Sequence, residues 1–190
     1  MFKRMRVVLA SKSPRRHELF KKLCRDFEIR DAEVAEIYLS VKPHAVVKEL
    51  ARLKARAAAT TGADAFIVAA DTIVFFNGTV LGKPSDKNEA FSMLKSICGK
   101  RHTVYTGVCF KTASAEHTFY DKTYVRLRAL SDAEIRAYID KYQPLDKAGA
   151  YGVQDGVLVE SFVGCYDNIM GFPTAKAERV LREIGADLNR

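Results

Sequence analysis

A turn near the start of the chain gathers residue types that bind phosphate. The apolar run at residues 7–10 predicts a short buried strand, and it breaks at once into Ser11-Lys12-Ser13-Pro14-Arg15-Arg16. Ser13 suits a helix N-cap and Pro14 suits the first helical turn, so a helix is expected to begin here. The positive dipole end of a helix attracts anions, and guanidinium groups grip phosphate oxygens in pairs. The turn therefore predicts an anion site, although an ordinary strand-to-helix turn with two solvated arginines explains the same residues.

A carboxylate follows the most apolar run of the chain. Residues 66–70 predict a strand that is covered on both faces, and Asp71 comes directly after it. Open α/β sheets place ligands at the carboxyl ends of their strands, so Asp71 is a candidate to hold a metal ion or to accept a proton. Glu33 and Glu36, in an acidic stretch, are hard-oxygen groups that could complete a Mg²⁺ or Mn²⁺ site with it. The alternative is that Asp71 only caps the next turn.

Two lysines and one glutamine are further candidate contacts to a phosphorylated ligand. Lys83 lies in the rigid turn Leu81-Gly82-Lys83-Pro84, and Lys54 lies on an amphipathic helix whose charged face is the simpler explanation for it. The segment 78–83 is not a P-loop, because its glycines are too close together and proline stands where Ser or Thr should be. Three glycines in the loop 146–156 let a backbone approach a ligand, and the Gln154 amide offers a donor and an acceptor to a nucleobase. A long surface loop is the alternative.

The composition sets wide limits. The chain has 190 residues, 48% hydrophobic and 28% charged, which is enough for one substantial domain or two small lobes. Its net charge of +8 favours an anionic partner such as a nucleotide, and a nucleic-acid-binding protein stays an alternative. No apolar run reaches the roughly 20 residues that span a bilayer, so we expect a cytoplasmic protein with no membrane partner. The four cysteines show no C-x-x-C spacing, which argues against a zinc ribbon or a redox motif.

Strands alternate with helices along the chain, which predicts an α/β fold with a mixed sheet. Helices are expected at 14–24, from Pro43 to a cap at Gly62, from Asp86 to Gly99, from Ser131 to Lys141, and from Pro173 to Gly185. Strands are expected at 7–10, 27–30, 66–70, 73–76, 79–81, 103–111, 118–130 and 157–163. Asn77-Gly78 predicts a hairpin turn, and 103–111 and 118–130 are expected to pair antiparallel.

Several blocks, in the right order, resemble the Maf family of nucleotide pyrophosphatases. They are Leu9-Ala-Ser-Lys-Ser-Pro-Arg-Arg-His-Glu-Leu, Val34-Ala-Glu36, Lys48-Glu-Leu-Ala-Arg-Leu-Lys-Ala, Ala70-Asp-Thr-Ile-Val, Leu81-Gly-Lys-Pro, His102-Thr-Val-Tyr-Thr-Gly-Val, Asp146-Lys-Ala-Gly-Ala-Tyr-Gly-Val-Gln and Tyr166-Asp-Asn-Ile-Met-Gly-Phe-Pro. The resemblance covers nearly the whole chain and implies a single domain over residues 1–190. It also implies an elongated mixed sheet flanked by helices, two lobes around a central cleft as in inosine-triphosphate pyrophosphatases, and a homodimer.

The resemblance further implies a reaction and a site. The reaction is hydrolysis of a nucleoside triphosphate to the monophosphate and pyrophosphate, with Mg²⁺ or Mn²⁺ as cofactor. Asp71 matches the proton acceptor and Glu36 a metal or water ligand, so both are expected at the metal. The positions that match phosphate contacts are Ser11, Ser13, Arg16, Lys54 and Lys83. The residues that match the positions setting base preference in the branch acting on dTTP and UTP are Arg15, Thr72 and Gln154.

Two features depart from the family pattern. Ala35 replaces a usual Asp before Glu36, which bears on the metal site. Asp155 and Gly156 follow Gln154 in a loop shorter than usual, which bears on base preference. The alternatives are a 7-methyl-GTP or inosine-triphosphate pyrophosphatase, and a non-catalytic regulator of cell division that binds nucleic acid. The loop that ends at Gln154 resembles the dTTP and UTP branch rather than the 7-methyl-GTP branch.

Overall fold

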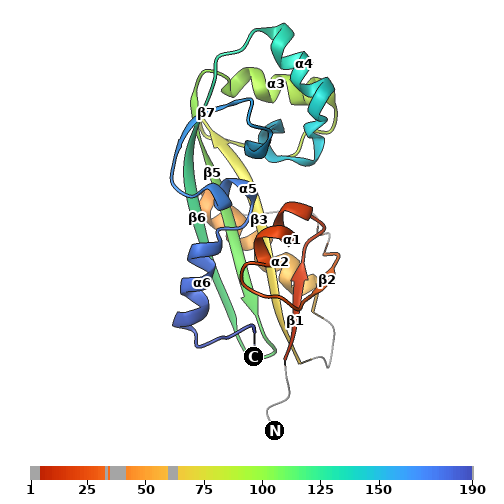
Figure 1. Ribbon diagram of the computed structural model, residues 1–190, viewed down its shortest axis with the longest axis vertical. Coiled ribbons are helices and arrows are strands. Elements are labelled where there is room, and N and C mark those ends of the chain that lie inside the picture. The colour runs from red at the N-terminus through yellow and green to blue at the C-terminus, as the bar shows by residue number, and fades with distance from the viewer. Residues whose placement is uncertain (1–4, 33, 35–41, 60–63, 190) are drawn as a thin grey trace. The chain divides into compact units, whose positions relative to one another are not determined.

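The computed structural model describes residues 5–32, 34, 42–59 and 64–189 (Figure 1). The chain divides into two compact units, the first made of Met1–Asp71, Thr106–Asp121 and Gly171–Arg190 and the second of Thr72–Tyr105 and Lys122–Met170. Three strands, β3 (Ala65–Phe76), β5 (Arg101–Lys111) and β6 (Glu116–Leu127), contribute residues to both units. The single domain, the two lobes and the central cleft stay predictions.

The sheet mixes parallel and antiparallel strands, which confirms the predicted α/β fold class. Its order is β2–β1–β3–β5–β6–β7, and β4 pairs with β3 off this path. β1 (Arg6–Ala10) runs parallel to β2 (Glu28–Arg30) and to β3. β4 (Thr79–Leu81) is antiparallel to β3, and β7 (Val159–Val163) is antiparallel to β6. β5 and β6 are neighbours joined by the short turn 112–115, so they too run antiparallel.

Three helices belong to the first unit: α1 (Pro14–Phe20), α2 (Pro43–Ala57) and α6 (Thr174–Glu183). α1 has seven residues and is shorter than expected. α2 begins at the predicted proline but ends at Ala57, with Ala58 as its C-cap, so it is shorter than expected. The cap expected at Gly62 lies outside the described residues. The apolar face of α2 includes Val46, Val47 and Leu50, all at most 1% exposed. Helical spacing of these residues gives α2 one buried face against the sheet.

The second unit contains α3 (Lys87–Ile97), α4 (Asp132–Tyr142), the short α5 (Tyr166–Met170) and the 3₁₀ turns η1 (Pro144–Asp146), η2 (Ala148–Ala150) and η3 (Val153–Asp155). α3 and α4 pack against each other (Figure 1). The helix starts expected at Asp86 and Ser131 are confirmed: Asp86 accepts from the N–H groups of Asn88 and Glu89, and Ser131 forms a capping box with Glu134. Asn77 and Gly78 both have positive φ, as the predicted hairpin turn requires.

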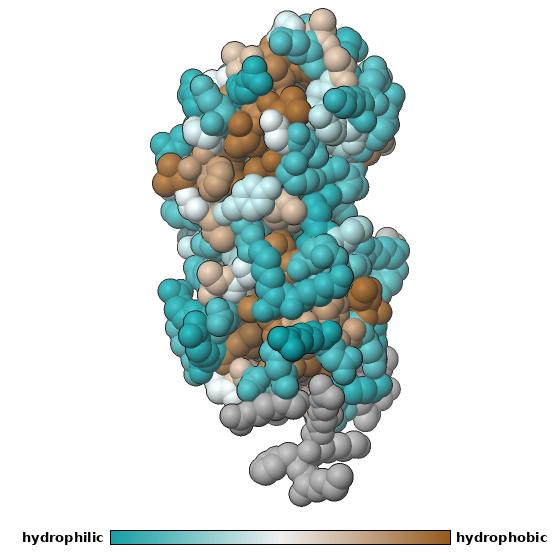
Figure 2. Space-filling model, viewed as in Figure 1, coloured by the Kyte–Doolittle hydropathy of each residue, from teal (hydrophilic) through white to brown (hydrophobic). Residues whose placement is uncertain are grey.

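The surface reflects the charged composition. Most residues on the face drawn in Figure 2 are hydrophilic, in line with a charged fraction of 28%.

All four cysteines are free, and Cys24 and Cys109 are buried. None of the helices in the described ranges combines the length and the hydropathy that a membrane crossing requires.

Candidate active site

A buried ion pair joins two of the residues that the sequence singles out. Lys54 Nζ, on α2, donates a hydrogen bond to Asp71 Oδ1, on β3, and both residues belong to the first unit. The lysine side chain is 15% exposed and the aspartate side chain 7%. A solvated helix face is therefore the wrong explanation for Lys54, because its ammonium reaches the sheet.

Asp71 lies inside a strand rather than after one, which corrects the expectation from the sequence. β3 continues without a break through twelve residues, so the two predicted strands 66–70 and 73–76 are one. β1, however, ends at Ala10, which pairs with Ala69 of β3. Asp71 is therefore just past the carboxyl end of the neighbouring parallel strand. This is the level at which open α/β sheets bind their ligands.

Small residues let α2 lie close to the sheet. Alanines of α2, β1 and β3 form one buried cluster, whose members include Ala10, Ala51, Ala55, Ala65 and Ala69. On β5, a Cβ built on Gly107 would lie 2.2 Å from the Val47 carbonyl oxygen, so the backbone of α2 fills the space that the glycine leaves. This close packing brings Lys54 within reach of Asp71.

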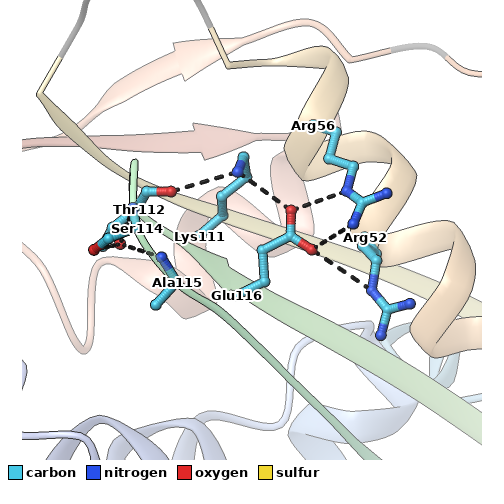
Figure 3. A network of polar contacts seen from close by, with 7 residues as sticks. All are labelled: Arg52, Arg56, Lys111, Thr112, Ser114, Ala115 and Glu116. Atoms are coloured by element: carbon cyan, nitrogen blue, oxygen red, sulfur yellow. Dashed lines mark hydrogen bonds and ion pairs between the residues drawn. The ribbon is translucent and has the colours of Figure 1, made fainter.

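A carboxylate among three cations ties α2 to the end of β5 and the start of β6 (Figure 3). Arg56 Nε and Nη2 each donate to Glu116 at 2.9 Å, and Lys111 Nζ lies 3.2 Å and Arg52 Nε 3.8 Å from the same carboxylate. Hydrogen bonds, that of Arg56 first, lower the pKa of Glu116 to about 2. Because Arg52 and Arg56 flank Lys54 in the sequence, the network fixes the helical turn that carries the lysine. This network was not predicted from the sequence, where its only signal is the i, i+4 spacing of the two arginines.

The predicted anion turn connects β1 to α1. Pro14 occupies the first helical position, whereas Ser13 forms no side-chain cap within the described part of the chain. The Ser13 N–H instead donates to the Ser11 hydroxyl at 3.2 Å, and His17 Nε2 lies 2.7 Å from the Ser11 carbonyl oxygen. Ser11 is buried, at 7% exposure. Since a hydroxyl that accepts one hydrogen bond still has its own hydrogen, Ser11 can also donate to an anion.

The basic residues of this turn also contact the protein. Lys12 Nζ forms an exposed ion pair with Asp31 Oδ2 at 2.7 Å. Arg16 Nε donates to the Gly171 carbonyl at 2.9 Å, and both Arg15 and Arg16 are half-buried. The turn thus gathers hydroxyl groups and cations at the carboxyl end of β1.

The remaining predicted site residues belong to the second unit. Thr72 is half-buried on β3, Lys83 is exposed just after β4, and Gln154 is exposed in η3. The Gly149 N–H donates to the Gly82 carbonyl at 2.9 Å, so the lysine turn contacts the loop that carries the glutamine. That these residues reach the same triphosphate as those of the first unit stays a prediction.

The proposed metal ligands are only partly described. Glu33 and Glu36 lie outside the described residues, so their approach to Asp71 stays a prediction. Within the described ranges, no group of three or more His, Cys, Asp or Glu residues could hold a metal ion. Mg²⁺ is usually held by one or two carboxylates together with substrate phosphates, so it needs no such cage. Asp71 is a buried carboxylate on β3, just past the level at which β1 ends, and it fits an ion held in that way.

Buried polar contacts in the second unit were not anticipated from the sequence. His102 Nε2 lies 2.8 Å from the Tyr151 hydroxyl. The Tyr138 hydroxyl donates to Asp155 Oδ2 at 2.5 Å and accepts from the Gly152 N–H at 3.1 Å. Burial lowers the pKa of His102 to about 4 and raises the pKa of Tyr151, so this pair is uncharged at neutral pH. The glycine-rich loop was the signal in the sequence, but its partners on α4 and β5 are far away along the chain.

The fold and these residues define a class: a mixed-sheet α/β protein with a buried Lys–Asp pair and a turn rich in hydroxyl and guanidinium groups at the end of its first parallel strand. A family model described as "Maf-like protein" matches residues 6–184. The chain belongs to this Maf family, which confirms the resemblance seen in the sequence.

Three proteins of related sequence have the same name. The dTTP/UTP pyrophosphatase of Carboxydothermus hydrogenoformans is 45% identical to this chain over 95% of the chain and 100% of that protein. Those of Caldicellulosiruptor saccharolyticus and Flavobacterium johnsoniae are each 44% identical, over 96% and 94% of this chain and 96% and 95% of their own lengths. The structure of the Staphylococcus aureus Ham1 protein aligns with a TM-score of 0.49 and 14% identity over 64% of this chain and 71% of that one. The fold class rests on the sheet itself.

Proposed function

We propose that this protein is a nucleoside triphosphate pyrophosphatase that hydrolyses dTTP and UTP to the monophosphate and pyrophosphate. The observation that carries the proposal is its identity of 44 to 45% to three dTTP/UTP pyrophosphatases over at least 94% of the chain. The first unit contains a buried carboxylate paired with a lysine, and this supports the proposal. Phosphoryl transfer is catalysed mainly by positioning and electrostatic stabilisation, and charged groups of this kind contribute both.

Asp71 is the residue that we assign to the attacking water. Because Lys54 contacts Oδ1, Oδ2 is the oxygen that accepts the hydrogen bond of the water and takes its proton. The water then attacks the α-phosphorus in line with the departing pyrophosphate. The ion pair holds the carboxylate in one orientation, and its burial limits competition from bulk water.

Cations and hydroxyl groups stabilise the charge that develops on the phosphoryl oxygens and on the leaving group. We assign Ser11, Ser13 and Arg16, on the turn after β1, and Lys83, on the turn after β4, to the phosphates. Lys54 joins them, because an ammonium has three N–H donors and the bond to Asp71 uses one.

A divalent cation, Mg²⁺ or Mn²⁺, belongs to the same proposal. Asp71 and Glu36 would hold it together with oxygen atoms of the substrate. When bound, the ion neutralises charge on the phosphates. The homodimer, which the family resemblance implies, and the cytoplasmic location, which the hydropathy of the sequence predicts, are likewise proposed.

Three residues are assigned to the nucleobase: Arg15, Thr72 and Gln154. The Gln154 amide offers one donor and one acceptor, which match the O4 and N3–H groups of uracil and thymine. A base that leaves the polar groups of the site without hydrogen-bond partners is strongly rejected. This matching gives the preference for dTTP and UTP its chemical basis.

A panel of triphosphates tests the substrate assignment. Pyrophosphate release is measured from dTTP, UTP, CTP, ITP and 7-methyl-GTP with Mg²⁺ and with Mn²⁺, and we expect dTTP and UTP to have the highest kcat/KM. A preference for ITP or 7-methyl-GTP would replace the substrate assignment. No release from any triphosphate, with salt-dependent binding to DNA, would instead favour a non-catalytic regulator.

The Asp71→Asn variant tests the mechanism. Loss of a general base lowers kcat by about 10²–10⁴-fold, and we expect the far-UV circular dichroism spectrum to stay that of the wild type. Asp121→Asn is the matched control, since Asp121 also faces a lysine of the first unit, with 3.7 Å between its Oδ1 and Lys176 Nζ. Full activity of Asp71→Asn would remove Asp71 from the mechanism.

A further inference from the structure

The amide of Gln154 lies over a glycine of its own loop. A Cβ built on Gly152 would lie 2.5 Å from Gln154 Nε2 and 2.9 Å from Gln154 Cδ. Gly152 itself is buried, whereas Gln154 is exposed. The glutamine side chain thus folds back across the glycine, while the residue as a whole stays exposed.

Glycine is required at position 152 because it has no side chain, and not because of its backbone conformation. Gly152 has φ −117° and ψ 129°, an extended conformation that any residue adopts. The same missing Cβ would also lie 2.8 Å from Asp155 Oδ2. The absent side chain of Gly152 is therefore replaced by the amide of Gln154 and the carboxylate of Asp155.

The Tyr138 hydroxyl fixes both sides of this arrangement. It accepts from the Gly152 N–H at 3.1 Å and donates to Asp155 Oδ2 at 2.5 Å. Tyr138 lies on α4, is 4% exposed and stacks on Tyr142 with ring centroids 4.8 Å apart. A hydroxyl on a packed helix thereby holds the loop at two points, one before and one after Gln154.

The residue before Gly152 is fixed as well. Tyr151 is buried, and its hydroxyl lies 2.8 Å from Nε2 of the buried His102 on β5. The loop is therefore held by α4 and by β5, so the exposed amide is presented from a rigid base. Groups that are fixed before a ligand arrives lose little freedom on binding it.

We propose that Gly152, Tyr138 and Asp155 are positioning residues that set the orientation of the Gln154 amide and thereby the preference for the nucleobase. The inference rests on the proposed function, since it concerns the selectivity of the same reaction. If the amide is turned, its NH₂ group faces the N3–H donor of the base and its carbonyl oxygen faces the O4 acceptor. This mismatch weakens the binding of uracil and thymine. The three residues act through Gln154 and need not touch the substrate.

Gly152→Ala is the sharpest perturbation. The extended backbone accepts alanine without strain, and the atoms in its way are ends of flexible side chains, so the variant is expected to fold. The Gln154 amide must move. We expect the ratio of kcat/KM for dTTP to that for CTP to fall by about tenfold or more, mainly through the KM for dTTP.

A double-mutant cycle separates positioning from a general structural effect. In a Gln154→Ala background the amide is absent, so adding Gly152→Ala should leave the dTTP to CTP ratio unchanged. Tyr138→Phe should lower the ratio in the same direction as Gly152→Ala. Tyr142→Phe is its matched control, because it removes a hydroxyl one turn further along the same helix, and it should leave the ratio at the wild-type value.

The outcomes distinguish this inference from the function on which it rests. A wild-type protein that releases pyrophosphate from no triphosphate overturns the proposed function and the inference with it. An active wild type whose dTTP to CTP ratio is unchanged by Gly152→Ala overturns the inference alone. A change of equal size in the Gln154→Ala background also overturns it, because Gly152 would then not act through the amide.

Discussion

Gly107→Ala tests whether the position of α2 governs the activity. The added Cβ would lie 2.2 Å from the Val47 carbonyl oxygen, 2.4 Å from its carbon and 2.7 Å from the Lys48 nitrogen. Since carbon atoms reach their optimal contact at about 3.5–4.0 Å, the helix must retreat by about 1 Å. The obstacle is backbone, so no change of side-chain rotamer relieves it.

The expected size of the effect follows from this overlap. Overpacking costs about 1–3 kcal/mol, and contact with backbone places Gly107→Ala at the upper end of that range. For a chain of this length about 1 kcal/mol lowers the unfolding midpoint by about 2–4 °C, so a drop of about 6–12 °C is expected. α2 also carries Lys54, whose ammonium must reach Asp71. Because a misplacement of about 1 Å can lower a rate about 10²-fold, kcat should fall by that order in the folded variant.

Two measurements check this prediction. Thermal unfolding gives the midpoint, and pyrophosphate release from dTTP well below the midpoint gives kcat of the folded protein. Gly82→Ala is the control for stability, because a Cβ there meets nothing within 4 Å. A wild-type midpoint for Gly107→Ala would refute the packing argument. A lowered midpoint with wild-type kcat would show that the position of α2 does not govern turnover.

Three other changes test separate features. Glu116→Gln should lower the midpoint at pH 7 by about 2–4 °C, because three cations share this carboxylate. The folded-state pKa of Glu116 is lowered to about 2, so the stabilisation by its carboxylate is present above the ordinary pKa of 4.5 and is lost as the pH falls toward 2. If the midpoints of Glu116→Gln and the wild type differed as much at pH 3 as at pH 7, this reasoning would be contradicted. Lys54→Met leaves the buried Asp71 carboxylate without its ammonium and should lower the free energy of unfolding in urea by about 3–5 kcal/mol. An unchanged value would reject the pair as a structural contact. Ser131→Ala removes the N-cap of α4 and should cost about 1 kcal/mol in the same titration, with Ser161→Ala on exposed β7 as the control that should change little.

Features set by a few neighbouring residues were predictable from the sequence. The caps at Asp86 and Ser131 and the turn at Asn77-Gly78 all lie where the sequence places them, because each depends on contacts within about four residues. The break expected at Asp71 was wrong, since a strand is held by its neighbours. β3 loses β1 after Ala69, but β5 is its neighbour on the other side and β4 pairs with it from Val74 onward, so it continues past the aspartate.

The parts of the site that depend on tertiary packing were not predictable. Lys54 and Asp71 are recognisable one by one, but their contact requires α2 to lie against β5 at Gly107. In the same way, Gln154 stands out as a polar residue in a glycine-rich loop. Two other residues of the same loop, however, are hydrogen-bonded to a tyrosine of α4, and no spacing in the loop reveals that partner.

The ion pair between Lys54 and Asp71 is better explained by chemistry than by stability. Removing two charges from water costs several kcal/mol per ion, and well-packed apolar residues of similar size are often as stabilising as a buried pair. The alanine cluster under α2 shows that this region packs closely with small apolar side chains. A fold that needed only stability here could have extended that cluster to both positions. The proposed reaction supplies the reason for two charges instead, because it requires a carboxylate of fixed orientation and a cation beside the phosphates.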